Sequence, residues 1–168
     1  KHRSANDARR IRVTPPLLNN LADAVNPLLA LTALVFAFAR RRQARELLPP
    51  WRFLTGLALA IAVVYVLQNL DSRLHLWSRL GLDYSTHSAF AVSVVTSVAL
   101  AERRWLFALA PVLAVYGWLM AHLGYHTVAD MIVAAAVLAP ATWVVHLLLR
   151  PAPTATPDAG QNAPPPGR

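Results

Sequence analysis

A carboxylate and two imidazoles lie at the edge of an apolar run in residues 119–130 (LMAHLGYHTVAD). If a helix begins at His126, then His126 and Asp130 are four residues apart on one face, within reach of each other. A carboxylate that holds an imidazole fixes its tautomer and raises its basicity, which suits a nucleophile or a general base. The alternative is a polar helix cap at a membrane boundary, in which a nearby donor satisfies Asp130.

A second polar cluster, Ser85-Thr86-His87, precedes another apolar run. Two predicted spans separate it from His126, so both clusters should lie at the same membrane surface. Each cluster opens a helix, and helix N-termini carry free N–H groups and positive partial charge that favour an anion such as phosphate. The alternatives are that His87 hydrogen-bonds a loop carbonyl at the edge of a span and that Ser85 is an ordinary N-cap.

The composition is typical of a membrane protein. Of the 168 residues, 56% are hydrophobic and 14% are charged, and the mean hydropathy is +0.41; soluble domains contain about 25% charged residues. The net charge of +8 comes largely from arginines that flank apolar runs, where a membrane explains them, so we reject nucleic-acid binding. The chain has no cysteine, which excludes disulfides and thiolate metal sites.

Apolar runs long enough to cross a bilayer predict an all-α, polytopic transmembrane helix bundle. The four predicted spans are residues 51–70, 84–101, 105–123 and 127–149. A further candidate at the N-terminus, residues 17–39, is cleanly apolar only over its second half, so either its earlier turns join the span or the segment does not cross. Its first half carries a polar stripe at helical spacing: Asn19, Asn20, Asp23 and Asn26.

The remaining segments are too polar to cross. Leu74, Trp77 and Leu80 recur every three residues within 71–83 and predict a short amphipathic helix in the interface. We therefore expect three parts: a basic N-terminal segment, a single membrane-embedded helical domain, and a disordered tail with six prolines. These parts are residues 1–16, 17–150 and 151–168. The first part does not lead into a compact apolar core, so no signal peptide is predicted.

Basic residues at 40–52, 103–104 and 150 fall on one side of the predicted spans. By the positive-inside rule that side is the cytoplasm, which places both polar clusters at the outer surface. An Ala-, Arg- and Pro-rich chain without cysteine is compatible with a bacterial source. We therefore expect an integral protein of a bacterial cytoplasmic membrane whose site faces the periplasm or exterior.

Both clusters resemble motifs of the integral-membrane branch of the type 2 phosphatidic-acid phosphatase superfamily, over about residues 51–149. The family's second motif, Pro-Ser-Gly-His, corresponds to YSTH, which ends at His87. Its third motif is Ser-Arg, five residues, His, three residues, Asp. Gly124, His126 and Asp130 match that motif at the family's spacing.

The resemblance implies a phosphatase for lipid phosphates or polyprenyl diphosphates that works through a phosphohistidine. His126 would attack phosphorus with Asp130 orienting it, His87 would protonate the leaving alcohol, and Ser85 would donate a hydrogen bond to phosphate. Water would then release inorganic phosphate, with no metal or other cofactor. The partners implied are the lipid bilayer and a lipid phosphate substrate.

The chain departs from the family at its cationic groups. Leu119 and Met120 replace Ser-Arg. The family's first motif, Lys, six residues, Arg-Pro, is not present as such, and Arg73 and Arg79 are the nearest candidates for binding phosphate. Loss of an arginine clamp costs about three to five orders of magnitude in phosphoryl-transfer rate. The alternative function is a catalytically degenerate member that acts as a structural or lipid-binding subunit of a larger membrane complex.

Two other histidines have simpler interpretations. His122, His126 and Asp130 follow the i, i+4, i+8 spacing of a metal-binding helix face, but Gly124 interrupts that helix, so we predict no metal site. His146, near the end of the last span, is interpreted as structural.

Overall fold

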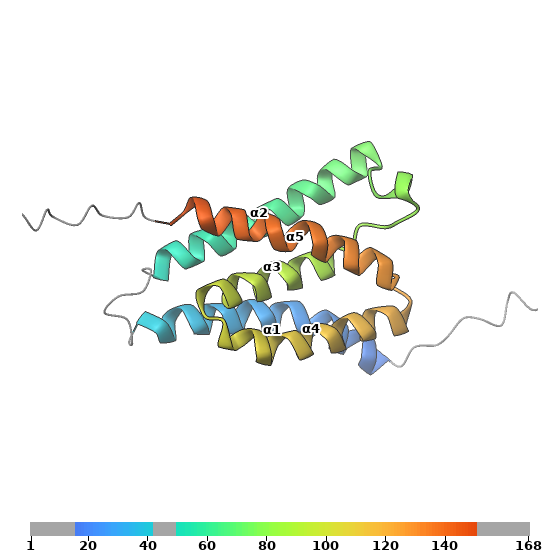
Figure 1. Cartoon of the computed structure of the whole chain (residues 1–168). Helices are drawn as coiled ribbons and strands as arrows, with labels where there is room; N and C mark the ends of the chain where they lie inside the picture. The colour runs from blue at the N-terminus through green and yellow to red at the C-terminus, as the bar shows by residue number, and fades with distance from the viewer. Residues whose placement is uncertain (1–15, 42–49, 151–168) are drawn as a thin grey trace, which may run out of the picture.

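The computed structural model describes residues 16–41 and 50–150. This part of the chain forms an all-α bundle in which consecutive helices run in opposite directions (Figure 1). The elements are α1 (Pro16–Arg41), α2 (Pro50–Leu74), the 3-10 turn η2 (Ser78–Leu80), α3 (Thr86–Ala101), α4 (Arg104–Leu123) and α5 (Val128–Leu148). The predicted helical class is confirmed. The predicted N-terminal segment up to residue 15, most of the first basic cluster (42–49) and the predicted tail (151–168) lie outside the described residues.

Four of the helices, α1, α2, α4 and α5, are long and apolar enough to cross a membrane. These helices indicate an integral membrane protein. The N-terminal candidate span forms one continuous helix despite Pro27. The predicted span at 84–101 is instead the shortest helix, α3, whose 16 residues rise about 24 Å, less than the roughly 30 Å of a hydrocarbon core.

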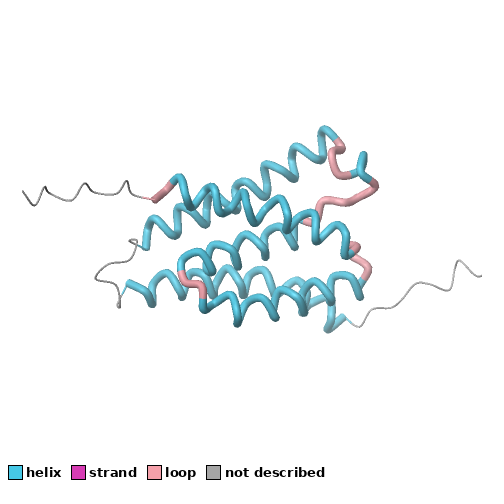
Figure 2. Tube along the Cα trace, viewed as in Figure 1, coloured by secondary structure: helices cyan, strands magenta, loops and turns pink. Residues whose placement is uncertain are grey.

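The short helix α3 is the centre of the bundle and contacts each of the other four helices (Figure 2). Its residues Ala89, Ser93 and Ser97 are spaced by four and are all buried. Small side chains at that spacing let a neighbouring helix approach closely. The helix α5 packs on α3 and buries Ala134, Leu138 and Thr142.

A polar contact joins α3 and α5 near their C-terminal ends, beside α2. His146 Nε2 on α5 lies 3.0 Å from Ser97 Oγ on α3. The imidazole fits because residue 56 on α2 is glycine: a Cβ there would lie 2.5 Å from His146 Cε1. This packing agrees with the structural interpretation of His146.

The prediction of an amphipathic interfacial helix over residues 71–83 is wrong. Its first four residues continue α2, which ends where His75 adopts a positive φ of 52°. The side chain of Asp71 then accepts a hydrogen bond from the Trp77 backbone N–H at 2.8 Å, which folds the chain into the single turn η2. Trp77 is buried whereas Leu80 is 72% exposed, so the three-residue spacing does not mark one face.

Candidate functional site

Both predicted polar clusters lie at the same end of the bundle. There α1, α3 and α5 begin and α2 and α4 end, as Figure 1 shows. We call it the histidine end, because His87 is the second residue of α3 and His126 lies in the turn between α4 and α5. The opposite end, called the arginine end, carries Arg103, Arg104 and Arg150.

The carboxylate of Asp130 caps the start of α5. Its Oδ2 accepts hydrogen bonds from the Thr127 backbone N–H and hydroxyl, both at 2.7 Å, and Thr127 Oγ1 accepts one from the Asp130 N–H at 3.2 Å. This reciprocal arrangement is a capping box. Oδ1 accepts a hydrogen bond at 2.9 Å from the backbone N–H of Asp83, 47 residues away. Asp130 therefore ties the loop before α3 to the first turn of α5.

The expected pairing of His126 with Asp130 is not formed. The helix α5 begins at Val128 with Thr127 as its N-cap, so His126 precedes the helix and does not share its face. The carboxylate of Asp130 instead accepts the three hydrogen bonds just described, as in the helix-cap alternative.

The carboxylate beside His126 is that of Asp83. His126 Nδ1 lies 3.5 Å from Asp83 Oδ2, slightly beyond the usual range of a hydrogen bond. Nδ1 is buried and has no hydrogen-bond partner among the residues that the structure describes. The side chain of His126 is 13% exposed and that of Asp83 is 76% exposed, so the carboxylate approaches a largely buried ring from the solvent side. The sequence interpretation missed Asp83, although a carboxylate two residues before Ser85 was a usable signal.

Ser85 forms the N-cap of α3 and is completely buried. Its Oγ accepts a hydrogen bond from the Ser88 backbone N–H at 3.4 Å and donates one to Ser88 Oγ at 2.8 Å. This is the ordinary capping role that we considered as the alternative. In this arrangement the hydroxyl proton is directed to Ser88 Oγ.

The two arginines considered for phosphate binding are exposed. Arg73 lies in the last turn of α2 and Arg79 in η2. Within residues 16–41 and 50–150, neither side chain forms an ion pair. The structure therefore leaves both side chains exposed at the histidine end.

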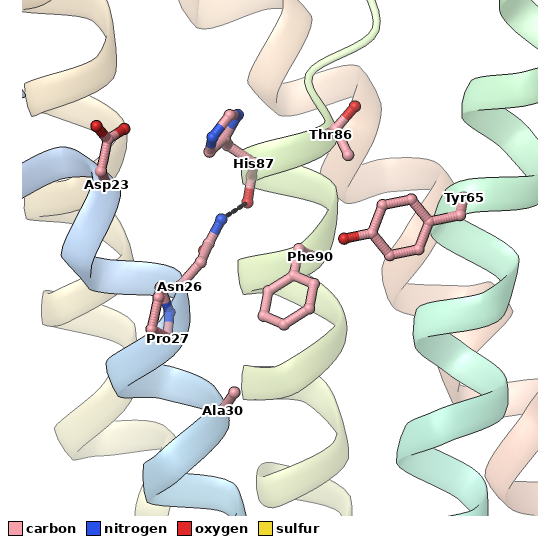
Figure 3. A pocket seen from close by; sticks show the side chains of 8 residues that line it. All are labelled: Asp23, Asn26, Pro27, Ala30, Tyr65, Thr86, His87 and Phe90. Atoms are coloured by element: carbon pink, nitrogen blue, oxygen red, sulfur yellow. Dashed lines mark hydrogen bonds between the residues drawn. The ribbon is translucent and has the colours of Figure 1, made fainter.

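A cavity of about 430 Å³ lies beside His87, between α1 and α2 and over α3 (Figure 3). Asn26 on α1 donates a hydrogen bond to the His87 carbonyl oxygen at 3.4 Å and so joins α1 to the start of α3. Ser85, His126 and Asp130 do not line this cavity, and neither does Arg73 or Arg79. The predicted site residues are thus divided between this cavity and the turn around His126. Eight residues line the cavity: Asp23, Asn26, Pro27, Ala30, Tyr65, Thr86, His87 and Phe90.

Tyr84 anchors the loop that carries Asp83. Its hydroxyl donates a hydrogen bond to the Val64 carbonyl oxygen at 2.9 Å, and its ring packs edge-on against Trp77 with 4.9 Å between centroids. Burial, and secondarily the nearby carboxylate of Asp71, raise the pKa of Tyr84 to about 12, because both disfavour the phenolate. The loop before α3 is therefore held from both sides, by the hydrogen bond from its Tyr84 to Val64 of α2 and by Asp130 of α5.

No group of three or more His, Cys, Asp or Glu side chains is arranged to hold a metal ion within the described ranges. Gly124 adopts a φ of 75° and ends α4, so His122, His126 and Asp130 do not share a helix face.

Comparisons of the chain with protein-family models, curated proteins and solved structures found no match. The resemblance to membrane phosphatases therefore depends on the motif residues themselves.

Proposed function

We propose that this protein is a membrane phosphatase for lipid phosphates or polyprenyl diphosphates in which His126 forms a phosphohistidine. The observation that supports the proposal most strongly is the approach of the Asp83 carboxylate to His126 Nδ1, at 3.5 Å. A carboxylate on that side favours the tautomer with a proton on Nδ1 and leaves the lone pair on Nε2 for attack. It also stabilises the positive charge that the ring acquires when Nε2 bonds to phosphorus.

The reaction has two steps. In the first, His126 Nε2 bonds to phosphorus while the bond between phosphorus and the lipid oxygen breaks, and His87 supplies a proton to that oxygen. In the second, water attacks phosphorus and gives a proton to His87, the P–N bond breaks, and inorganic phosphate leaves. The N-termini of α3 and α5 add positive partial charge at the same end of the bundle.

The proposal reassigns one role. Asp83 replaces Asp130 as the carboxylate that orients His126. Asp130 becomes a positioning residue, because it accepts the hydrogen bond from the Asp83 backbone N–H and so fixes the place from which Asp83 reaches the ring. We also propose that the source is a bacterium and that the histidine end faces the periplasm or exterior, because the turn between α3 and α4 and the end of α5 carry Arg103, Arg104 and Arg150 at the opposite end.

A second candidate is a membrane subunit that has kept the phosphatase-like arrangement without catalysis. The state of Ser85 favours it, since this hydroxyl is buried and used for capping. The exposed positions of Arg73 and Arg79 also favour this candidate. Among the described residues, no arginine or lysine pairs with His126 or Asp83, and none lines the cavity beside His87. Such a subunit would bind lipid or pack against other membrane proteins.

Phosphate release by the purified full chain in detergent separates the two candidates. Short-chain phosphatidic acid and undecaprenyl diphosphate are the substrates, and His126→Ala is the inactivating variant. His122→Ala is the matched control, because its ring is exposed and stacks on Trp118. Release by the wild type and His122→Ala, but not by His126→Ala, supports the enzyme. Equal background release from all three proteins contradicts it and leaves the subunit.

Labelling tests the orientation separately. The sequence has no cysteine, so a single cysteine can be introduced at exposed Ser78 in η2 or at Glu102 next to the arginine end. In intact cells, a membrane-impermeant maleimide should label Ser78→Cys and not Glu102→Cys. The reverse pattern contradicts the proposed orientation.

A further inference from the structure

The cavity beside His87 is polar at one end and apolar at the other. Asp23, Asn26 and His87 line it near the histidine end, and Ala30 and Phe90 line it deeper in the bundle (Figure 3). Asp23 and Ala30 are seven residues apart on α1, so the change from polar to apolar takes place over about 10 Å. The cavity therefore matches a molecule with a polar head and an apolar body.

The helices on either side of the cavity separate toward the histidine end. At the other end α1 and α2 pack closely, with 5.5 Å between the ring centroids of Phe36 and Phe53. From there α2 diverges from α1 (Figure 1). Both helices are long and apolar enough to cross a membrane, so the cavity between them has its polar part toward the membrane surface and its apolar part at the depth of the acyl chains.

The charge in the cavity selects among headgroups. Asp23 is the acidic residue of the lining, His87 is its one histidine, and neither lysine nor arginine contributes to it. A carboxylate attracts a cation. A primary ammonium group offers three N–H donors, whereas a choline ammonium offers none. The lining is thus complementary to a headgroup that carries a primary amine.

We propose that the cavity binds a lipid of the phosphatidylethanolamine class. Its ammonium group donates to the Asp23 carboxylate, its phosphodiester accepts from the His87 imidazole, and an acyl chain lies along Ala30 and Phe90. This binding goes beyond the proposed phosphatase activity, because the lipid is a phosphodiester and no bond in it is broken. The experiment that tests it measures lipid binding, which does not depend on phosphate release.

Native mass spectrometry of the full chain measures this selectivity. Detergent-solubilised protein is incubated with equal amounts of phosphatidylethanolamine, phosphatidylcholine and phosphatidylglycerol of matched acyl chains. The wild type should retain one phosphatidylethanolamine in clear preference to the other two. Asp23→Asn should reduce that retention at least about fivefold, because a charge-assisted hydrogen bond becomes a neutral one. Glu102→Gln removes the same charge near the arginine end and should leave retention unchanged.

A second pair of variants tests the apolar part. Ala30→Trp fills the cavity and should abolish retention of the lipid, whereas Leu31→Trp changes a neighbouring side chain that is 54% exposed and should not. Helix content and elution volume in detergent show that each variant is folded. The proposal is overturned if the wild type retains the three lipids in the proportions supplied, or if folded Asp23→Asn retains phosphatidylethanolamine as well as the wild type does.

Discussion

Replacing Gly56 by alanine tests how tightly α2, α3 and α5 pack around His146. A Cβ at this position would lie 2.5 Å from His146 Cε1 and 2.7 Å from Nδ1, far inside van der Waals contact. The imidazole must move, and its 3.0 Å contact with Ser97 Oγ is then lost. Overpacking costs about 1–3 kcal/mol and the lost hydrogen bond about 1 kcal/mol. We therefore predict that the free energy of unfolding falls by about 2–4 kcal/mol.

Unfolding in detergent by titration with sodium dodecyl sulfate, followed by circular dichroism, measures this change. Gly117→Ala is the matched control, because its Cβ would meet only Met131 Sδ at 3.7 Å, an ordinary contact. Alanine has the higher helix propensity, so this control should be neutral or slightly stabilising. In a His146→Ala background Gly56→Ala should lose its cost, since the clashing ring is gone. An equal cost for both glycine variants, or a cost that persists without His146, would refute the packing described here.

Three further predictions concern the histidine end. Asp130→Asn weakens the capping box and the bond to the Asp83 N–H, and should lower the free energy of unfolding by about 1–3 kcal/mol in the same titration. Asp83→Asn keeps that backbone bond and changes a side chain that is 76% exposed, so it should unfold like the wild type yet release phosphate about 10- to 100-fold more slowly. This loss is smaller than the 10⁴-fold known for a buried triad aspartate, because solvent screens Asp83. Tyr84 has a folded pKa of about 12 against 10.0 when unperturbed, so its stabilising contribution is present below pH 10 and declines as the pH rises toward 12. Alkaline unfolding of the wild type against Tyr84→Phe measures this contribution, and parallel curves would contradict it.

The sequence predicted the helical elements better than it predicted their polar contacts. Long apolar runs and the Gly124 interruption marked the helices because hydrophobicity and backbone conformation are local properties. The same spacing could not decide whether the last helix begins at His126 or after Thr127. Thr127 followed three residues later by Asp130 fits a capping box, and that pattern is the signal that could have decided it. The hydrogen bond from the Asp83 N–H to Asp130 joins residues 47 positions apart, so the pattern of neither segment specifies that bond.

The role of the polar stripe in the first helix also depends on contacts with other helices. Asp23 and Asn26 interrupt the apolar run of the first predicted span, and both line the cavity beside His87. Their meaning depends on how α1 packs on α3, which the sequence of α1 alone does not specify. The prediction for the segment after α2 was wrong for a similar reason, because the buried position of Trp77 depends on its contact with Tyr84.

Trapping of the covalent intermediate tests the central claim most directly. Purified protein is incubated with phosphatidic acid labelled with ³²P in the phosphate, quenched in base, and separated by electrophoresis. We predict a label on the wild type and on His122→Ala that is stable in base and released by acid, as a phosphohistidine is, and no label on His126→Ala. Absence of label from the wild type, or label that persists on His126→Ala, would contradict the account.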